Sequence, residues 1–296
     1  MKVGIIGLGR MGQAMVQRLV TQGVNDIVVW DRNQERINQV SSLSIQVQVG
    51  LHASDVANRS DYIMVMINDD AGAVNLYQNK VGLLAGEVAG KLFIEMSTLQ
   101  PKTLRYLEEQ VLSKGASLLG APMMGSIPTV LEGKLFLPLG GHPEDIERAM
   151  PIFKLISRST KHVGSIGQGH AAKLAVNLTM AAYLQALTEG LAMALAEGVS
   201  MDDLLDVLCE APTANGWLKS KVSVLKGGSS ETTLDIVSLR KDVINAVATG
   251  ALSGVPMSMA ASIASSLSGA VAQGQGGRDL ATFPSLFRET LIQKAA

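Results

Sequence analysis

The chain has 296 residues, of which 47% are hydrophobic and 17% charged, and its formal net charge is −1 at pH 7. This length suits two domains with a substantial core. A near-neutral charge gives no electrostatic reason to bind nucleic acid or an anionic membrane surface. The single cysteine, Cys209, excludes an internal disulfide, and we expect a reducing, cytoplasmic compartment with Cys209 as core filler.

Two apolar stretches invite a comparison with membrane and export signals. Residues 1–7 become glycine-rich almost at once, and no small-residue cleavage site follows them, so we expect no signal peptide. Residues 243–277 contain no charge and are long enough to cross a bilayer. Gly250, Gly254 and Pro256 interrupt this stretch, which is rich in Ser, Ala and Gly. We therefore expect buried helices there and no membrane span.

The first half of the chain alternates short apolar runs with helical patterns. Strands are expected at residues 3–6, 27–30, 47–49, 62–67, 91–96, 118–119 and 134–139, and helices at 11–22 and 34–40. The run at 62–67 is apolar throughout, which is typical of a parallel strand covered on both faces. Strands that alternate with helices predict an α/β fold with a doubly wound parallel sheet.

A glycine-rich turn joins the first strand to the first helix. In this context its spacing has a physical meaning: one glycine permits the tight turn, the next lets the backbone approach a pyrophosphate, and the last lets helix and strand pack closely. The phosphates would then face the positive end of the helix. The turn predicts a Rossmann-type dinucleotide site whose cofactor contacts are Gly7, Leu8, Gly9, Arg10, Met11 and Gly12.

Asp31 ends the second strand about twenty residues after this turn, where a carboxylate commonly bonds the adenosine ribose. A carboxylate disfavours the 2′-phosphate of NADP, so Asp31 favours NAD. Arg32 follows directly and can pair with that phosphate instead. The expected cofactor is therefore NAD, with NADP as the alternative.

The second half is helical in pattern. Strand signals end near residue 164, and residues 168–198 predict one long apolar-periodic helix. Further helices follow, separated by glycine-rich turns at 227–229 and 274–277. We place a dinucleotide-binding Rossmann domain at residues 1–163 and an all-helical substrate and oligomerisation domain at 164–296, joined by the long helix.

Lys173 and Asn177 lie four residues apart near the start of this long helix and share one face. Reduction of a carbonyl needs a proton for the developing alkoxide as hydride reaches carbon, and a lysine ammonium can donate it. Partial burial beside a cationic nicotinamide would lower the pKa of Lys173. Asn177 can hold the substrate oxygen or the lysine by hydrogen bonds.

Four motifs in this order resemble the β-hydroxyacid dehydrogenases, which include 3-hydroxyisobutyrate dehydrogenase, tartronate semialdehyde reductase and the glyoxylate/succinic semialdehyde reductases. The glycine turn with Met15 is close to the family's GLGxMGxxM signature. Residues 120–126, G-A-P-M-M-G-S, stand where the family carries D-A-P-V-S-G-G. Residues 167–177 match its GxGxxxKxxxN, and residues 241–242 match its late Lys-Asp pair.

This resemblance covers essentially the whole chain and implies an NAD(P)-dependent dehydrogenase that interconverts a small β-hydroxy acid and its semialdehyde or keto acid. It implies that Lys173 is the acid/base and that Asn177 positions the substrate. It also implies that Thr98 lies near the nicotinamide ribose, and that Lys241 reaches the nicotinamide or substrate while Asp242 orients it. A homodimer or homotetramer is expected, as in the family.

Two positions depart from the family pattern. Asn68 stands where relatives often have proline after the middle strand, so that cofactor-contacting loop is expected to differ. Met124 replaces the serine that helps to hold the substrate carboxylate, and methionine cannot donate a hydrogen bond. The backbone N–H groups of Gly125 and Ser126 can still form an anion site with the Ser126 hydroxyl. A larger or less polar substrate is therefore open, and the sequence names none.

Two other functions stay as alternatives: an imine reductase, which has a related architecture, and a non-catalytic dinucleotide-binding scaffold. Imine reductases usually lack a lysine at this position, and a scaffold needs neither Lys173 nor Asn177. The four histidines show no metal-ligand spacing, so no metal is expected. His170, beside the start of the long helix, is left without a role. The expected partner is a small carboxylic acid, with no nucleic acid and no membrane.

Overall fold

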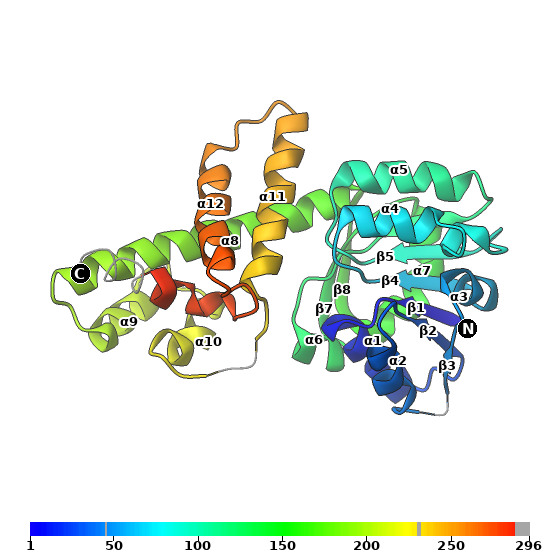
Figure 1. The fold of residues 1–296 in the computed structure, drawn as a ribbon, viewed down its shortest axis with the longest axis horizontal. Coiled ribbons are helices and arrows are strands. Elements are labelled where there is room, and N and C mark those ends of the chain that lie inside the picture. The colour runs from blue at the N-terminus through cyan, green and yellow to red at the C-terminus, as the bar shows by residue number, and fades with distance from the viewer. Residues whose placement is uncertain (45, 230–231, 288–296) are drawn as a thin grey trace. The chain divides into compact units, whose positions relative to one another are not determined.

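The computed structural model describes residues 1–44, 46–229 and 232–287, and the chain folds as two compact units, Met1–Leu174 and Ala175–Ala296. The two units divide inside one long helix, α8 (Gln168–Ala196). Figure 1 shows the mixed α/β unit and the helical unit.

The first unit is built on an eight-stranded sheet with the order β3-β2-β1-β4-β5-β6-β7-β8. The strands are β1 (Val3–Ile6), β2 (Ile27–Trp30), β3 (Val47–Val49), β4 (Tyr62–Val65), β5 (Leu92–Glu95), β6 (Ser117–Gly120), β7 (Leu135–Gly140) and β8 (Ser157–Gly164). The six strands β1 to β6 are parallel to one another, whereas β7 pairs antiparallel with β6 and parallel with β8. The doubly wound α/β fold is confirmed, with the last two strands reversed.

Helices cover both faces of this sheet (Figure 1). They are α1 (Arg10–Thr21), α2 (Gln34–Ser41), α3 (Ala53–Arg59), α4 (Asp70–Gln78), α5 (Pro101–Leu112), α6 (Ile127–Leu131) and α7 (Pro143–Ile156), with a 3-10 turn η1 (Leu83–Ala85). Leu19 of α1 and Ile152 of α7 belong to the core of one face, and Val56 of α3 and Leu104 of α5 to the core of the other. Two separate cores explain why the central strands are apolar at nearly every position.

The strand order reverses at β1, which lies between β2 and β4. In open α/β sheets, ligands bind at the carboxyl ends of the strands beside such a reversal. The turn after β1 contains the predicted phosphate loop, and the turn after β4 contains Asn68. The topology thus brings two predicted cofactor segments to one edge of the sheet.

Strand β8 was not predicted from the sequence. Its eight residues, S-R-S-T-K-H-V-G, include one large apolar residue, Val163, and all eight are exposed or partly exposed. An edge strand with solvent on its outer side needs no hydrophobic alternation, and charged residues there discourage pairing with other chains. For this reason β8 has no periodic signal in its sequence.

The second unit is helical over its described residues, except for an isolated bridge between Asp235 and Asp279. It contains most of α8, then α9 (Met201–Glu210), α10 (Gly216–Leu225), α11 (Ile236–Leu252), α12 (Ser258–Ala272) and a 3-10 turn η2 (Leu280–Thr282). The charge-free stretch 243–277 contains the end of α11 and all of α12, and Val243, Ile263 and Leu267 lie in the core. Among the described helices, α8 alone is long and apolar enough to cross a membrane, which a core helix of a soluble protein would also be.

A buried ion pair fixes α10 within this unit. The Lys221 ammonium lies 2.9 Å from Oδ2 of Asp279, and both residues are buried. Thr233 donates to the same oxygen through its N–H and its hydroxyl, and the Ala281 N–H donates to Oδ1. Burial raises the pKa of the Asp279 carboxyl, but these donors outweigh it and hold that pKa below its ordinary value. Asp279 thus joins three segments of the helical unit.

Candidate active site

The glycine turn after β1 has the geometry that a pyrophosphate requires. Gly7 has φ +90°, and a Cβ there would lie 2.0 Å from the Met66 carbonyl oxygen. A Cβ on Gly12 would lie 2.0 Å from the Gly7 carbonyl oxygen, whereas a Cβ on Gly9 would meet nothing within 4 Å. Gly9 is the N-cap of α1, and no side chain caps that helix end. The turn is closed towards the protein and open on the side of Gly9, which fits phosphates bound at the positive end of α1.

The Asp31 side chain points into the protein and accepts a hydrogen bond from this turn. Its Oδ2 accepts the Leu8 N–H at 2.6 Å and lies 3.7 Å from the Arg36 guanidinium, and its Oδ1 accepts the Asn33 N–H at 2.8 Å. The side chain is only 6% exposed. Arg32, by contrast, is exposed and makes no hydrogen bond or ion pair with the described residues. The geometry therefore leaves Arg32 more accessible to a ligand than Asp31.

The turns after β4 and β5 are joined by Ser97. The Ile67 N–H donates to the Ser97 hydroxyl oxygen at 2.8 Å, which links the two turns at the sheet edge. Asn68 is exposed and Thr98 is partly buried. Asp70, at the start of α4, accepts from the Gln100 N–H, so the same edge is tied to the start of α5. The predicted cofactor contacts Asn68 and Thr98 thus lie on neighbouring turns of one edge.

A buried carboxylate lies at the end of β5. No motif in the sequence indicates it. Glu95, the last residue of β5, has no exposed surface. It accepts the Ser97 N–H at 3.0 Å and the Tyr77 hydroxyl at 3.1 Å. Burial raises the pKa of Glu95 to about 7, although these donors oppose the rise, and burial also raises the pKa of Tyr77 well above its ordinary value. The sequence feature that could have indicated Glu95 is a carboxylate at the end of an otherwise apolar strand.

The first turn of α8 is packed closely onto the sheet edge. A Cβ on Gly167 would lie 2.9 Å from the Pro101 carbonyl oxygen, and a Cβ on Gly169 would lie 2.4 Å from that of Pro138. The buried His170 lies 3.0 Å from the Ser97 carbonyl oxygen through Nε2, which must be the donor because a carbonyl only accepts. His170 therefore has a packing role, and Lys173 follows it by three residues.

Within the helical unit, three of the predicted residues come together. Asn177 is buried, and its Nδ2 donates to Oδ2 of Asp242 at 2.5 Å. The Lys241 ammonium lies 3.0 Å from Oδ1 of the same carboxylate, and the Lys241 side chain is 29% exposed. Asp242 thus fixes the amide of Asn177 and lies beside Lys241. This pair is only partly exposed, unlike an ordinary surface ion pair.

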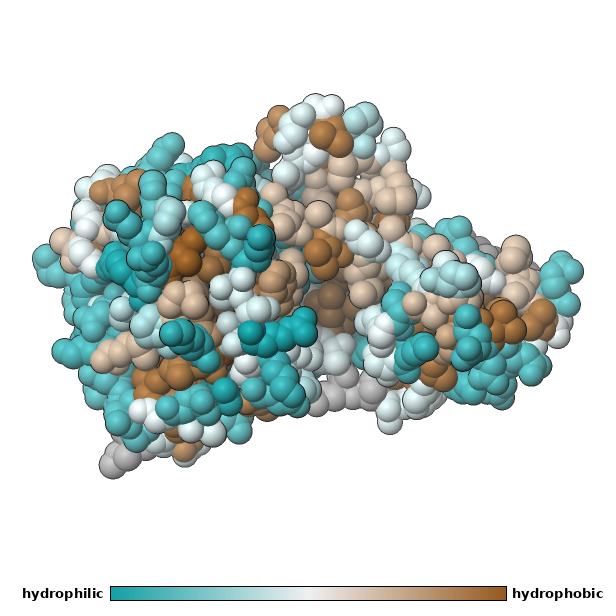
Figure 2. All heavy atoms as spheres, turned by 180° about the vertical axis from the view of Figure 1, so that it is seen from behind, coloured by the Kyte–Doolittle hydropathy of each residue, from teal (hydrophilic) through white to brown (hydrophobic). Residues whose placement is uncertain are grey.

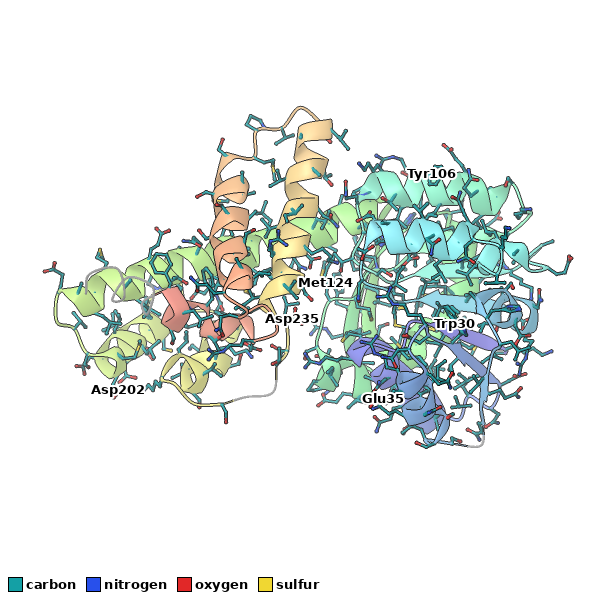
Figure 3. The ribbon with its side chains drawn as sticks, in the orientation of Figure 1. Trp30, Glu35, Tyr106, Met124, Asp202 and Asp235 are labelled. Carbon is teal, nitrogen blue, oxygen red and sulfur yellow. The ribbon has the colours of Figure 1, made fainter. Side chains whose placement is uncertain are left out.

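The segment after β6 carries Met124 (Figure 3). Its backbone N–H donates to the Phe136 carbonyl, and its carbonyl accepts from the Phe136 N–H, so the Met124 backbone belongs to the sheet. Gly125 is exposed with φ +154°, and the Ser126 hydroxyl lies 3.2 Å from that of Thr129. The expected anion site, formed by the N–H groups of Gly125 and Ser126 with the Ser126 hydroxyl, stays a prediction, and the Met124 N–H is already used in the sheet.

Two other histidines, His52 and His162, have local structural roles. His52 caps α3 through Nδ1, and Nε2 of His162 lies within hydrogen-bond distance of the carbonyls of Gly141 and Gly164. No group of three or more His, Cys, Asp or Glu able to hold a metal occurs among the described residues.

Comparison with known protein families covers nearly the whole chain. The model of the NAD-binding domain of 6-phosphogluconate dehydrogenase matches residues 2–164. The model described as the NAD-binding part of NADP-dependent 3-hydroxyisobutyrate dehydrogenase matches residues 167–286. Both halves therefore match nicotinamide-dinucleotide dehydrogenases.

Individual relatives match this chain over most of its length. Glyoxylate/succinic semialdehyde reductase 1 of Arabidopsis thaliana is 29% identical over 94% of this chain and 96% of its own length. The cytokine-like nuclear factor N-PAC of Homo sapiens is 28% identical over 88% of this chain, which spans about half of the N-PAC length, 46%. The solved structure of 3-hydroxyisobutyrate dehydrogenase of Mycobacterium tuberculosis with L-serine has a TM-score of 0.85 at 22% identity, and covers 97% of this chain and 99% of that one.

Proposed function

Because the chain belongs to the β-hydroxyacid dehydrogenase family, an NAD(P)-dependent oxidoreductase family, we propose that it interconverts a small β-hydroxy acid and its semialdehyde or keto acid. The observation that carries this proposal is the anchoring of the first turn of α8. His170 bonds the Ser97 carbonyl at the carboxyl edge of the sheet, and Lys173 follows one turn later. That edge is where dinucleotide folds bind their ligands.

In the proposed mechanism Lys173 is the proton donor for reduction. When bound, the nicotinamide supplies the hydride that forms the new C–H bond. The Lys173 ammonium stabilises the negative charge that develops on the carbonyl oxygen and transfers one proton to it, which completes the hydroxyl group. In the oxidation direction the neutral amine takes that proton back.

Asn177 and Asp242 are proposed to position the substrate oxygen. The 2.5 Å bond from Asn177 to Asp242 fixes the amide plane, and the amide keeps a second N–H to offer. Lys241, 3.0 Å from Asp242, is held by the same carboxylate and is proposed to reach the cofactor or substrate. Gly125 and Ser126 are proposed to hold the acid group, beside a Met124 side chain that favours an apolar substituent.

The proposed reaction is tested with a panel of small semialdehydes and keto acids, together with neutral ketones and imines, at saturating NADH or NADPH. The loss of reduced-nicotinamide absorbance measures turnover. Turnover confined to the carboxylic acids supports the proposal. Turnover of imines alone would assign the imine reductase alternative, and tight dinucleotide binding without turnover on any compound would favour a scaffold.

We also propose that NADP is the preferred one of the two expected cofactors, although the residue types at Asp31 and Arg32 favoured NAD. The Asp31 oxygens accept two backbone N–H groups and are almost fully buried, so they offer little to ribose hydroxyls. Arg32 is exposed beside them, and a guanidinium binds a phosphate by strong charge-assisted hydrogen bonds.

Replacing Arg32 with glutamine is therefore expected to weaken NADPH binding by about 10- to 100-fold, the effect of one charged hydrogen bond, and to leave NADH binding nearly unchanged. Fluorescence titration gives both dissociation constants without turnover. Arg59→Gln is the matched control, since Arg59 bonds Asp55 and lies on α3. Wild-type protein that binds NADH more tightly than NADPH would contradict this preference.

A homo-oligomer is proposed from the apolar surface of the helical unit. Only 28% of the apolar window of α8 is buried, and Met193, Leu252 and Met259 are 67%, 67% and 58% exposed. Figure 2 shows apolar residues at the surface of this unit. Surfaces of this kind are commonly covered by a second subunit.

The single cysteine supports a reducing, cytoplasmic location.

If a second copy covers α8, light scattering is expected to give the mass of two or four chains, and Met193→Glu should shift the population towards single chains. The charge would have to be buried at the interface, which is costly. Glu197→Gln, at the exposed end of the same segment, serves as the control. A wild-type mass of one chain at all concentrations would contradict the proposal.

A further inference from the structure

The proposed reaction assigns no role to the buried carboxyl group of Glu95. A carboxyl group with no exposed surface ends a strand that is otherwise apolar. Burying a carboxylate costs free energy unless donors compensate for it. The pKa of Glu95, raised to about 7 by burial, means that this compensation is incomplete. An apolar residue of similar size would avoid this cost, so the carboxylate points to a functional role.

Hydrogen bonds connect Glu95 with the turns that carry predicted cofactor contacts and with the first turn of α8. Its two oxygens accept the Tyr77 hydroxyl of α4 and the Ser97 N–H of the turn after β5. The Ser97 hydroxyl receives the Ile67 N–H, and the Ser97 carbonyl receives Nε2–H of His170. The chain of hydrogen bonds therefore connects two cofactor-side turns with the first turn of α8.

We infer that Glu95 is a positioning residue: its carboxylate holds the Ser97 backbone, and through it the His170 ring, so that α8 presents Lys173 for proton transfer. This inference rests on the proposed function for its activity readout. An ionised carboxylate accepts both hydrogen bonds as charge-assisted bonds, which are stronger than the bonds that a neutral carboxyl accepts. The positioning effect is therefore strongest in the ionised form.

The groups facing Glu95 support this role. Tyr77 and Asp70 lie on α4, and the negative charge of Asp70 opposes ionisation of Glu95. His170 of α8 contacts the far side of Ser97. Since the folded-state pKa of Glu95 lies above its ordinary value, the folded protein binds more protons than the unfolded chain between about pH 4.5 and pH 7. Stability from this group therefore falls as pH rises through that window.

The variant Glu95→Gln separates positioning from folding. At about pH 8 it is expected to be at least as stable as the wild type, because it removes the buried charge, and this difference should vanish towards about pH 5, where Glu95 is protonated. Its kcat is nevertheless expected to fall between about 10- and 100-fold at pH 8, as for a small misplacement of catalytic groups. The deficit should shrink as pH falls below about 7 and the wild type loses its own carboxylate.

Hydrogen exchange gives a readout that is independent of turnover. Amide exchange over residues 166–174 is expected to be faster in Glu95→Gln than in the wild type at about pH 8 and similar at about pH 5. Exchange over α1 should not change. Glu108→Gln is the matched control, since burial also raises the pKa of this α5 carboxyl, and it should change neither kcat nor exchange over 166–174.

The inference is overturned if Glu95→Gln exchanges like the wild type over residues 166–174, or if its kcat stays within about twofold of wild type at pH 8. Faster exchange over this segment in a protein that turns over no acid would refute the proposed function and leave the Glu95 contact chain intact. The two failures are thus distinguishable.

Discussion

Replacing Lys173 with alanine is expected to lower kcat by about two to four orders of magnitude, the usual contribution of a general acid. Alanine removes both the proton and the positive charge that stabilises the developing alkoxide. Binding of the dinucleotide at the glycine turn should persist, because residues 7–12 and Arg32 are untouched. Steady-state reduction of the best substrate from the panel, with fluorescence titration of the dinucleotide, measures both quantities.

The control for this variant is Lys154→Ala, which removes an exposed lysine from α7 of the same unit. It should leave kcat unchanged. A Lys173→Ala protein that retains kcat within about threefold of the wild type would remove Lys173 from the mechanism, since such a change is far below a general-acid effect.

Replacing Asp279 with alanine is expected to destabilise the helical unit by about 3–5 kcal/mol, the usual cost of leaving one buried charge without its partner. Lys221 is only 5% exposed, and its buried ammonium would lose this carboxylate partner. Urea denaturation followed by Trp217 fluorescence in a Trp30→Phe background reports this unit, because Trp217 lies one turn before Lys221 on α10.

Two further variants test whether loss of the ion pair accounts for the lower stability of Asp279→Ala. Lys221→Met combined with Asp279→Leu removes both charges and is expected to recover most of the lost stability. Asp202→Ala breaks the exposed pair with Lys226 and should change stability little. Since the Asp279 pKa lies below its ordinary value, its contribution should be present at neutral pH and disappear as pH falls through the folded-state pKa. An Asp279→Ala protein as stable as the wild type would contradict this role of the ion pair.

Much of the α/β unit could be predicted because its central strands are buried on both faces. Runs such as residues 27–30 and 62–65 are apolar throughout, and the glycine spacing after β1, between a strand and a helix, is typical of a dinucleotide-binding turn. Strand β8 could not be predicted, since a polar edge strand carries no such pattern. The reversal of β7 and β8 depends on pairing that no local pattern encodes.

The site residues show a similar division. The glycine turn has the expected backbone, because sterics alone require glycine at Gly7 and Gly12. The orientation of Asp31 could not be predicted, since the residue type does not say whether its carboxylate faces a ligand or the Leu8 N–H. Glu95 was missed because one charge at a strand end is easily taken as exposed. The roles of Lys173, Asn177 and Asp242 in catalysis remain predictions.

This chain is proposed to move a hydride between a nicotinamide and the carbonyl carbon of a small acid. The most direct measurement uses NADPH that carries deuterium at the transferable position of the nicotinamide, with the preferred semialdehyde or keto acid, and NMR of the product. We predict one deuterium at the hydroxyl-bearing carbon of the wild-type product and a strongly reduced yield with Lys173→Ala. A product without that deuterium, or no product from any acid in the panel, would contradict the proposed function.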